Sequence, residues 1–293
     1  MTERSRFPRT DLYVALATIL WGTDYLFAKI ALREVSPVSF AAIRTLISTA
    51  VMLSLFLRRE PDWRVKPRHL WSLLGLALLG TFANRIFWAA GMNLTTASNA
   101  SLLSTTSPIF VLIVSFFLFR ATVTRRSALG IFISFIGVSL VIQGDWLEWA
   151  RGGGNFWGDL CMLMASLTWA FFTVLAKFLM KEYSSDKVTA YIMVIGSLLY
   201  LPFLGNEHPG GWGGVSALGW VSVLYVALTG NLLAYLLWMR GIQNIGPLRT
   251  ILYSYLTPVT AILLAVPFLN ETLTLAQIGG ALVVFAGVFL ARS

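Results

Sequence analysis

The second half of this chain repeats the first half at a nearly constant spacing. Near the start of each half, four residues recur 148 positions apart: Asp11, Trp21, Lys29 and Glu34 return as Asp159, Trp169, Lys177 and Glu182. Further along, the spacing is 150: Gly80, Trp88, Gly91, Ser104 and Pro108 return as Gly230, Trp238, Gly241, Ser254 and Pro258. Apolar composition alone does not repeat Asp, Lys, Trp and Pro, so the pattern indicates a duplicated unit.

Composition places both copies in a membrane. The residues are 57% hydrophobic and 12% charged, and the mean hydropathy is +0.75, whereas a soluble domain is nearer half apolar and a quarter charged. A membrane-spanning helix needs about 20 mainly apolar residues. The sequence predicts an all-α integral membrane protein with ten such helices, over residues 11–32, 37–58, 69–92, 97–119, 126–143, 156–179, 187–204, 215–240, 247–268 and 273–291.

Five spans in each copy determine how the copies relate to each other. The expected organisation is a first five-helix repeat over residues 1–143, a glycine-containing linker over 144–155, and a second repeat over 156–293. An odd number of spans places the second copy upside down relative to the first. Inverted repeats are typical of secondary transporters, and the two copies are expected to form one membrane domain because each alone would leave polar groups against lipid.

The charges predict an orientation. The formal net charge is +9, and most bases fall at helix ends that one arrangement puts in the cytoplasm, among them Arg4, Arg6, Arg9, Arg58, Arg64, Lys66, Arg68, Arg125, Lys181 and Arg249. The positive-inside rule then predicts an inner-membrane protein with both termini cytoplasmic. No small-residue cleavage site precedes Lys29, so the first span is expected to be uncleaved rather than a signal peptide.

Three ionisable residues lie within predicted spans, where they are costly and by default indicate function. They are Asp24, Arg44 and Arg85. The corresponding positions of the second repeat are uncharged: Phe172 is the counterpart of Asp24, and Tyr235 is the counterpart of Arg85. A structural ion pair between Asp24 and one of the arginines is an equally open explanation. Because the charges are confined to one copy, they are the best indication of where a substrate binds.

Aromatic and hydroxyl side chains extend this candidate site. Trp21 and Trp169 lie about 15 Å inside their helices, near the midplane, whereas Trp88 and Trp238 lie nearer helix ends, where an interfacial belt is favoured. Spans 4 and 9 carry runs of Ser, Thr and Tyr ahead of Pro108 and Pro258, which suits either a cavity wall or a polar packing face. The candidate substrate-binding residues are Trp21, Asp24, Tyr25, Arg85, Trp88, Ser101, Thr105, Trp169, Phe172, Tyr235 and Tyr253.

The sequence lacks the residues that several classes of activity require. There is no phosphate-binding G-x-x-x-x-G-K-[ST] loop and no H-E-x-x-H, and the two histidines and single Cys161 cannot form a metal or disulfide framework. We therefore expect no enzyme activity, no cofactor, no metal and no nucleic-acid partner. The expected partners are a small-molecule substrate and the lipid bilayer, and the oligomeric state stays open. Glycines seven residues apart in spans 5 and 10 predict close helix packing, as scaffold or dimer contact.

Two stretches of the first repeat resemble a known family. They are W-G-T-D-Y-L-F-A-K at 21–29 and G-x-N-x-T-T-A-S-x-A-S-L-L-S-T-T-S-P-I-F at 91–110, and their counterparts in the second repeat lie at 167–177 and 253–262. The chain resembles the EamA-type branch of the drug/metabolite transporter superfamily, and within it the YddG-type exporters of aromatic amino acids. The resemblance implies efflux through a central cavity lined by spans 1, 3, 4, 6, 8 and 9.

The resulting hypothesis is an exporter of aromatic or apolar amino acids that works by alternating access. Asp24 would meet the substrate ammonium, Arg85 the carboxylate, and Trp21, Trp169 and Tyr253 the ring. The alternatives are an exporter of drug-like or other small metabolites and, less in keeping with the sequence, a membrane enzyme or a channel.

Overall fold

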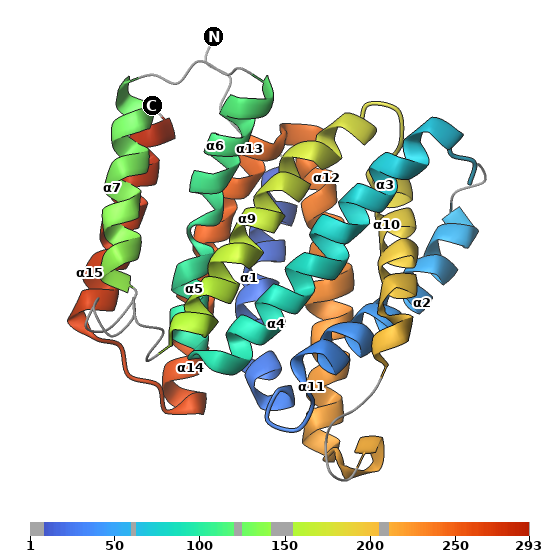
Figure 1. Cartoon of the computed structure of the whole chain (residues 1–293), viewed down its shortest axis with the longest axis horizontal. Helices are drawn as coiled ribbons and strands as arrows, with labels where there is room; N and C mark the ends of the chain where they lie inside the picture. The colour runs from blue at the N-terminus through green and yellow to red at the C-terminus, as the bar shows by residue number, and fades with distance from the viewer. Residues whose placement is uncertain (1–8, 60–62, 120–124, 142–154, 205–210, 293) are drawn as a thin grey trace.

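The computed structural model describes residues 9–59, 63–119, 125–141, 155–204 and 211–292, and these residues form a bundle of helices (Figure 1). The predicted linker over 144–155 lies outside the described residues, except for its last position. Within these described ranges, eight helical segments are long and apolar enough to cross a membrane, and two shorter apolar helices accompany them. Over the described residues, all ten predicted spans are mainly helical, and their ends differ from prediction by a few residues.

The first repeat begins with α1 (Arg9–Ala31) and α2 (Pro37–Arg59). Its third span consists of η1 (Pro67–His69), α3 (Leu70–Ala77), η2 (Leu78–Ala83) and α4 (Asn84–Leu94). Its fourth span consists of α5 (Ala97–Ser104) and α6 (Ser107–Phe119), and its last helix is α7 (Arg125–Val141).

The second repeat begins with α9 (Phe156–Leu179), followed by α10 (Ser185–Tyr200) with η3 (Leu201–Phe203) and then η4 (Gly211–Gly214). The eighth span consists of α11 (Ala217–Leu228), η5 (Thr229–Ala234) and α12 (Tyr235–Ile245). The ninth span consists of α13 (Pro247–Ile251), η6 (Leu252–Tyr255) and α14 (Leu256–Leu269), and the last helix is α15 (Leu275–Arg292).

Hydroxyl side chains define where several helices begin. Thr96, Ser184 and Ser216 each precede a helix and accept a hydrogen bond from the backbone N–H three residues later. Such caps satisfy donors that the first helical turn leaves without a partner. Because the backbone cannot hydrogen-bond to lipid, these caps let the short turns between spans lie at the membrane surface.

Four of the spans are interrupted, and the interruptions correspond between the repeats. Spans 3 and 8 each contain a π-helical segment, η2 and η5, which includes the repeat-related glycines Gly80 and Gly230. Spans 4 and 9 lose regular α-helix just before Pro108 and Pro258, because proline cannot donate the hydrogen bond to the preceding turn. A π-helical segment in a helix frequently marks a functional site.

The hydrogen bonds of two lysines show that the repeats are inverted. Near the end of α1, Lys29 Nζ donates to the Met92 carbonyl at the end of α4, and near the end of α9, Lys177 Nζ donates to the Gln243 carbonyl at the end of α12. The neighbouring Asn244 bonds Thr10 at the start of α1. The end of α9 therefore lies at the face where α1 begins, so α1 and α9 run in opposite directions (Figure 1). Both lysines bind helix C-terminal carbonyls, which explains their repetition better than exposure to the interface does.

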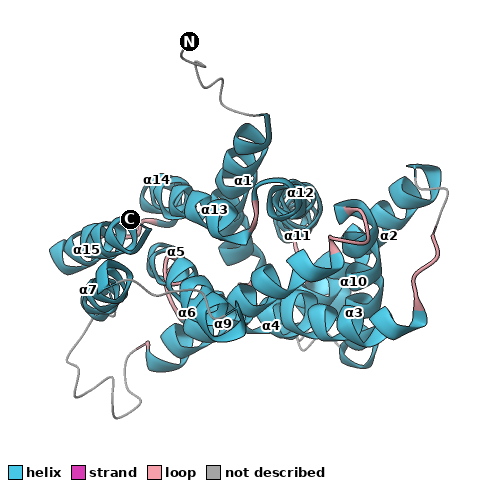
Figure 2. Ribbon diagram, turned by 90° about the horizontal axis from the view of Figure 1, so that it is seen from above, coloured by secondary structure: helices cyan, strands magenta, loops and turns pink. Residues whose placement is uncertain are grey.

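The last helix of each repeat packs against its counterpart. α7 and α15 lie side by side at the edge of the bundle (Figure 2). A Cβ on Gly137 would lie 2.5 Å from the Val284 backbone nitrogen, and a Cβ on Gly287 would lie 2.6 Å from the Gly130 carbonyl oxygen. Close packing of these two helices, predicted from the glycine spacing, is confirmed.

Candidate functional site

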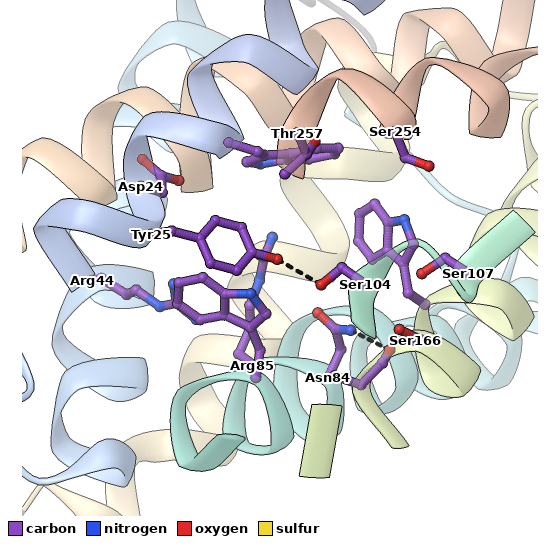
Figure 3. Close-up of a pocket in the computed structure, with 14 residues that line it drawn as sticks. Asp24, Tyr25, Arg44, Asn84, Arg85, Ser104, Ser107, Ser166, Ser254 and Thr257 are labelled. Carbon is purple, nitrogen blue, oxygen red and sulfur yellow. Dashed lines mark hydrogen bonds between the residues drawn. The ribbon is translucent and has the colours of Figure 1, made fainter. Parts of the chain in front are cut away.

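A cavity lies between the two repeats and holds about 660 Å³ of empty space, including its open part. Figure 3 shows the lining side chains converging from α1, α2, α4, the fourth span, α9 and the ninth span. The lining residues are Trp21, Asp24, Tyr25, Arg44, Asn84, Arg85, Trp88, Ser104, Ser107, Ala165, Ser166, Trp169, Ser254 and Thr257.

Two buried arginines supply positive charge to this cavity. The Arg44 guanidinium lies 4.8 Å from the ring centres of both Phe40 and Trp88, and the Arg85 guanidinium lies 5.2 Å from the Tyr235 ring. Within the described part of the chain, Arg44 Nε and Nη2 and Arg85 Nε are buried without a hydrogen-bond partner. Aromatic faces stabilise a cation, but they leave the N–H donors unsatisfied, and an anionic group could accept from them.

Asp24 lies at one end of the same cavity and is only 4% exposed. Its Oδ1 accepts a hydrogen bond from Thr229 Oγ1 at 3.1 Å. Its Oδ2 rests on Gly230, where a Cβ would lie 1.4 Å from it. Among the described residues, no arginine or lysine nitrogen approaches this carboxylate within 4.0 Å. The structural ion pair considered from the sequence is therefore not formed, and both arginines and the acid face the cavity separately.

Aromatic rings form two walls. Trp21 and Trp169 meet edge to face with 5.4 Å between ring centres, and Tyr25 and Trp88 do the same at 5.4 Å. Trp21 Nε1 donates to the Gly230 carbonyl at 3.0 Å, so its indole donor is satisfied and its ring is held in place. Trp238, expected at the interface, is fully buried and packs 4.9 Å from Trp21. The belt interpretation is thus wrong for Trp238, and Trp88 lines the cavity.

Four of the cavity hydroxyls come from repeat-related positions in spans 4 and 9. Ser104 and Ser107 correspond to Ser254 and Thr257, and all four line the cavity just ahead of the prolines. The Tyr25 hydroxyl bonds Ser104 Oγ at 2.6 Å (Figure 3). Of the two explanations for these polar spans, the cavity wall applies at these four positions.

The cavity lining includes six of the eleven predicted site residues, namely Trp21, Asp24, Tyr25, Arg85, Trp88 and Trp169. The other five lie outside it. Ser101 and Thr105 are buried and donate to carbonyls of their own helix, at Ser98 and Leu102. Phe172 and Tyr235 stack on each other behind Trp169, with 5.7 Å between ring centres. Tyr253 instead bonds Asp11 near the start of α1.

The predicted set left out seven polar residues that line the cavity, namely Arg44, Asn84, Ser104, Ser107, Ser166, Ser254 and Thr257. Arg44 was identified as a membrane charge but was not placed among the candidate binding residues. Asn84 and Ser166 were not singled out at all, although Asn84 Nδ2 now bonds the Ala165 carbonyl at 2.8 Å and joins α4 to α9. Asn84 has Ala234 as its repeat counterpart, so the asymmetry that pointed to Asp24 could also have found it.

Two repeat-related contacts close the bundle on its opposite faces. Where α1 begins, Asp11 is 1% exposed and accepts from Arg249 Nη2 at 2.8 Å and from the Tyr253 hydroxyl at 2.7 Å. On the other face, Asp159 accepts from Asn99 Nδ2 at 2.7 Å. Asp159 is the repeat counterpart of Asp11, and Asn99 is that of Arg249. We name these contacts the Asp11 pair and the Asp159 pair; each joins one repeat to the other.

Comparison with known proteins finds related transporters that match most of the chain. The chain is 28% identical over 285 residues to an uncharacterized transporter of Archaeoglobus fulgidus, covering 96% of each chain. It is 28% identical to the uncharacterized transporter YyaM of Bacillus subtilis, covering 96% of this chain and 93% of the relative. It is also 27% identical to the uncharacterized inner membrane transporter YedA of Escherichia coli over 258 residues, 87% of this chain and 81% of the relative.

A solved crystal structure shares the fold, with a TM-score of 0.70 at 20% identity over 97% of this chain and 96% of the other. The EamA-like transporter family profile matches twice, at residues 8–143 and again at 156–293. The two matches correspond to the two repeats, and the inverted arrangement surrounds a cavity that both repeats line. The chain is therefore a multi-pass membrane transporter rather than an enzyme, and it belongs to the EamA-like transporter family of the drug/metabolite transporter superfamily.

Proposed function

We propose that this transporter exports amino acids with aromatic or apolar side chains from the cytoplasm, as the YddG-type exporters that it resembles do. The observation that carries this proposal is the composition of the cavity. Two arginines with unsatisfied donors, one carboxylate and two aromatic walls surround the same space. This set complements a carboxylate, an ammonium and an apolar side chain on one small molecule.

The substrate carboxylate is assigned to Arg44 and Arg85. Their unsatisfied buried donors are costly as they stand, and a hydrogen bond to a charged group contributes about 1.5–3 kcal/mol. Planar guanidinium groups also fit a carboxylate with two parallel hydrogen bonds. A neutral drug-like solute would leave these donors unpaired, so the arginines favour an anionic group over the alternative of uncharged metabolites.

The substrate ammonium is assigned to Asp24, and the side chain to the tryptophans. Among the described residues, Asp24 accepts one hydrogen bond, from the Thr229 hydroxyl, and therefore retains acceptor capacity. Trp21 and Trp169 offer an apolar surface beside it, and a buried aromatic ring contributes through both its area and its edge-to-face contacts. Tyr253, expected to hold the ring, lies outside the lining and is not part of this assignment.

Transport is proposed to occur by rocking of one repeat against the other. The Asp11 pair and the Asp159 pair join the repeats on opposite faces, so breaking one pair while the other persists would expose the cavity to one side at a time. This use of two repeat-related contacts is in keeping with alternating access in inverted-repeat carriers.

The test is uptake of labelled amino acids into proteoliposomes that contain the full chain. Trp169→Ala should reduce transport of phenylalanine more than that of alanine, because only the larger side chain uses the indole wall. Trp71→Ala removes an exposed tryptophan away from the cavity and serves as the control, with no change in selectivity. Equal loss for both substrates would contradict the ring-binding role, and counterflow stimulated by unlabelled substrate distinguishes a carrier from a channel.

A further inference from the structure

The second helix of each repeat contacts the π-helical segment of the other repeat. α10, from the second repeat, reaches η2 in the first, and α2, from the first repeat, reaches η5 in the second. The two helices meet where Ser197 Oγ donates to Thr49 Oγ1 at 2.7 Å. These two residues are repeat counterparts, 148 positions apart. The axis that relates the repeats therefore passes close to this hydrogen bond, and the contacts on its two sides can be compared.

Tyr200, at the end of α10, binds the backbone of η2. Its side chain is fully buried, and its hydroxyl lies 2.9 Å from the Phe82 carbonyl oxygen and 3.1 Å from that of Thr81. Where a membrane helix departs from regular α-helix, the freed backbone groups need partners from neighbouring helices. Tyr200 supplies such a partner, and the two carbonyls share its single proton.

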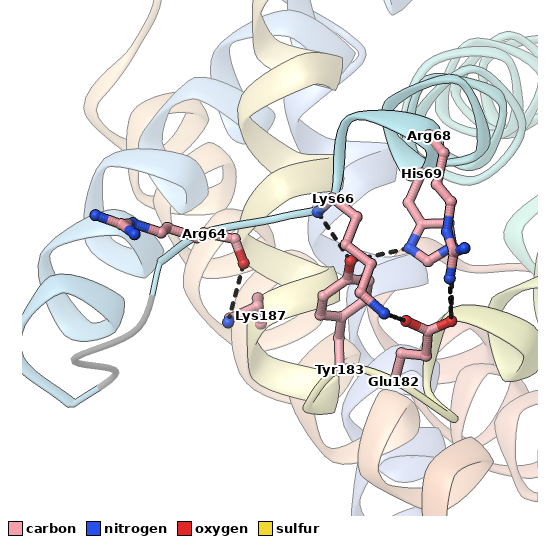
Figure 4. A network of polar contacts seen from close by, with 7 residues as sticks. All are labelled: Arg64, Lys66, Arg68, His69, Glu182, Tyr183 and Lys187. Atoms are coloured by element: carbon pink, nitrogen blue, oxygen red, sulfur yellow. Dashed lines mark hydrogen bonds and ion pairs between the residues drawn. The ribbon is translucent and has the colours of Figure 1, made fainter.

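The other end of α10 is also held against the third span. Ahead of α10, the Glu182 carboxylate accepts from Arg68 Nη2 at 3.2 Å, and the Tyr183 hydroxyl lies 2.9 Å from His69 Nδ1 (Figure 4). Arg68 and His69 belong to η1, at the start of the third span. Contacts at both ends thus align α10 along this span and define where the Tyr200 hydroxyl meets it.

The shape of η2 determines the direction of Arg85. The Asn84 backbone N–H donates to the Leu79 carbonyl, five residues earlier, whereas a regular α-helix uses the carbonyl four residues earlier. One extra residue in a turn rotates the side chains that follow by about 100° around the helix axis. The wide turn that Tyr200 binds therefore decides whether Arg85 faces the cavity.

Ser48, in α2, occupies the corresponding place beside η5. Its fully buried Oγ accepts from Asn231 Nδ2 at 2.9 Å and shares its proton between the Ala227 carbonyl, at 2.9 Å, and a carbonyl of the preceding turn of α2. Asn231 is the repeat counterpart of Thr81. Ser48 is that of Gly196, where a Cβ would lie 2.3 Å from Thr81 Cγ2. The two contacts are equivalent in position, but their chemistry differs.

Asp24 depends on η5 as Arg85 depends on η2. The Thr229 hydroxyl donates to one oxygen of its carboxylate, and the other oxygen lies against Gly230. Thr229 and Gly230 are the first two residues of η5, and Asn231, which Ser48 binds, is the third. A shift of η5 would therefore move the carboxylate within the cavity.

We propose that Tyr200 and Ser48 position the two charged ends of the binding site. Tyr200 fixes the direction of Arg85, which meets the substrate carboxylate, and Ser48 fixes the place of Asp24, which meets the ammonium. This inference rests on the proposed function, which assigns those two roles. Neither Tyr200 nor Ser48 is among the described residues that line the cavity. Removing either hydroxyl should therefore weaken recognition of one substrate charge and leave recognition of the other unchanged.

The experiment measures phenylalanine uptake by the full chain in proteoliposomes, in competition with two analogues. Phenethylamine lacks the carboxylate, and N-acetylphenylalanine lacks the ammonium. A hydrogen bond contributes about 1 kcal/mol, which corresponds to about a fivefold change in affinity. Tyr200→Phe should therefore lower the preference for phenylalanine over phenethylamine about fivefold and leave the preference over N-acetylphenylalanine unchanged. Ser48→Ala should have the opposite pattern.

The control is Tyr191→Phe, on the same helix. It removes a hydroxyl that donates to the Trp63 carbonyl, away from η2, and should change neither preference. Tyr200→Phe keeps the ring that packs 4.9 Å from Phe82, so the contact between the helices is retained. If either Tyr200→Phe or Ser48→Ala lowers both preferences equally, or changes neither, the proposal is overturned.

Backbone hydrogen exchange separates this inference from the proposed function, because it needs no substrate. Tyr200→Phe should speed exchange in η2 and leave η5 unchanged, and Ser48→Ala should do the reverse. If the wild-type chain carries no amino acid but exchange follows this pattern, the proposed function is wrong while the positioning of Arg85 and Asp24 stands. Faster exchange in both segments with either variant, or in neither, would show that the two hydroxyls have no separate roles.

Discussion

The Asp11 pair offers a direct test of how the repeats move. The change is Arg249→Gln, which removes the positive charge beside a buried carboxylate and leaves the Tyr253 hydroxyl in place. Because Arg249 belongs to the second repeat and Asp11 to the first, the variant weakens the connection between them on the face where α1 begins. The Asp159 pair on the other face is untouched.

The size of the effect follows from the exposure of the two partners. A hydrogen bond between charged groups contributes about 1.5–3 kcal/mol. Arg249 is 53% exposed, so water screens the pair and its contribution falls just below this range, to about 1.4 kcal/mol. That free energy corresponds to about a tenfold change in the ratio of molecules closed to molecules open on this face.

The assay uses thiol accessibility in sealed vesicles. The chain has a single cysteine, Cys161, so Cys161→Ser provides a background without thiols, and Ser107→Cys then places one thiol at the cavity wall. A charged, membrane-impermeant thiol reagent is added to one side at a time. Arg249→Gln should speed labelling from the face where α1 begins by up to tenfold and slow labelling from the opposite face.

The matched variant is Asn99→Ala, which breaks the Asp159 pair instead. It should change labelling in the opposite direction, faster from the far face and slower from the face where α1 begins. If both variants speed labelling from both faces, the pairs only hold the bundle together and the rocking interpretation is wrong. No change with either variant would refute the reasoning as well.

Further predictions concern two glycines that contact buried side chains, the acid Asp24 and the surface acid Glu182. Gly230→Ala should displace Asp24, cost about 1–3 kcal/mol of stability in a thermal unfolding measurement and abolish most transport. Gly80→Ala should displace the Phe172 ring, which lies 2.3 Å from the new Cβ, with a similar loss of stability but a smaller effect on substrate charge selectivity. Asp24→Asn should reduce transport of free amino acids more than that of their N-acetyl analogues, as competition assays would show. A hydrogen bond and nearby cations lower the pKa of Glu182, so its contribution to stability is present above its ordinary pKa and lost as pH falls through the lowered value; Glu182→Gln should remove that acid-side dependence of the unfolding temperature.

The helical spans could be predicted closely because hydropathy and length determine them. The run from Phe156 to Leu179 was predicted at both ends, since an apolar stretch of that length has no other stable form in lipid. It was harder to predict from the sequence which side of a span faces the cavity. Ser101 and Thr105 satisfy their hydroxyls within their own helix, so their polarity carries no information about direction, whereas Ser104 on the same span lines the cavity.

Aromatic residues were misplaced for a related reason. Distance from a helix end places a tryptophan along the membrane normal, but it does not say whether the ring points to lipid or to a neighbouring helix. Trp238 was predicted near a helix end, but its span continues to Ile245 and the ring is buried against Trp21. That contact depends on the packing of α12 against α1, two segments far apart in the sequence. Only the three-dimensional arrangement could supply it.

The comparison of the repeats shows how a symmetric scaffold acquires an asymmetric site. Gly80 and Gly230 occupy equivalent π-helical segments, and each lacks a Cβ because a side chain from the opposing first helix fills that space. The Phe172 ring fills the space beside Gly80, and the Asp24 carboxylate fills the space beside Gly230. The backbone geometry is therefore preserved by duplication while the chemistry of the occupant is free to change. Gly230 thus places the Asp24 carboxylate at the cavity, where the proposed substrate ammonium would meet it, whereas the Phe172 ring on Gly80 lies behind Trp169 and outside the lining.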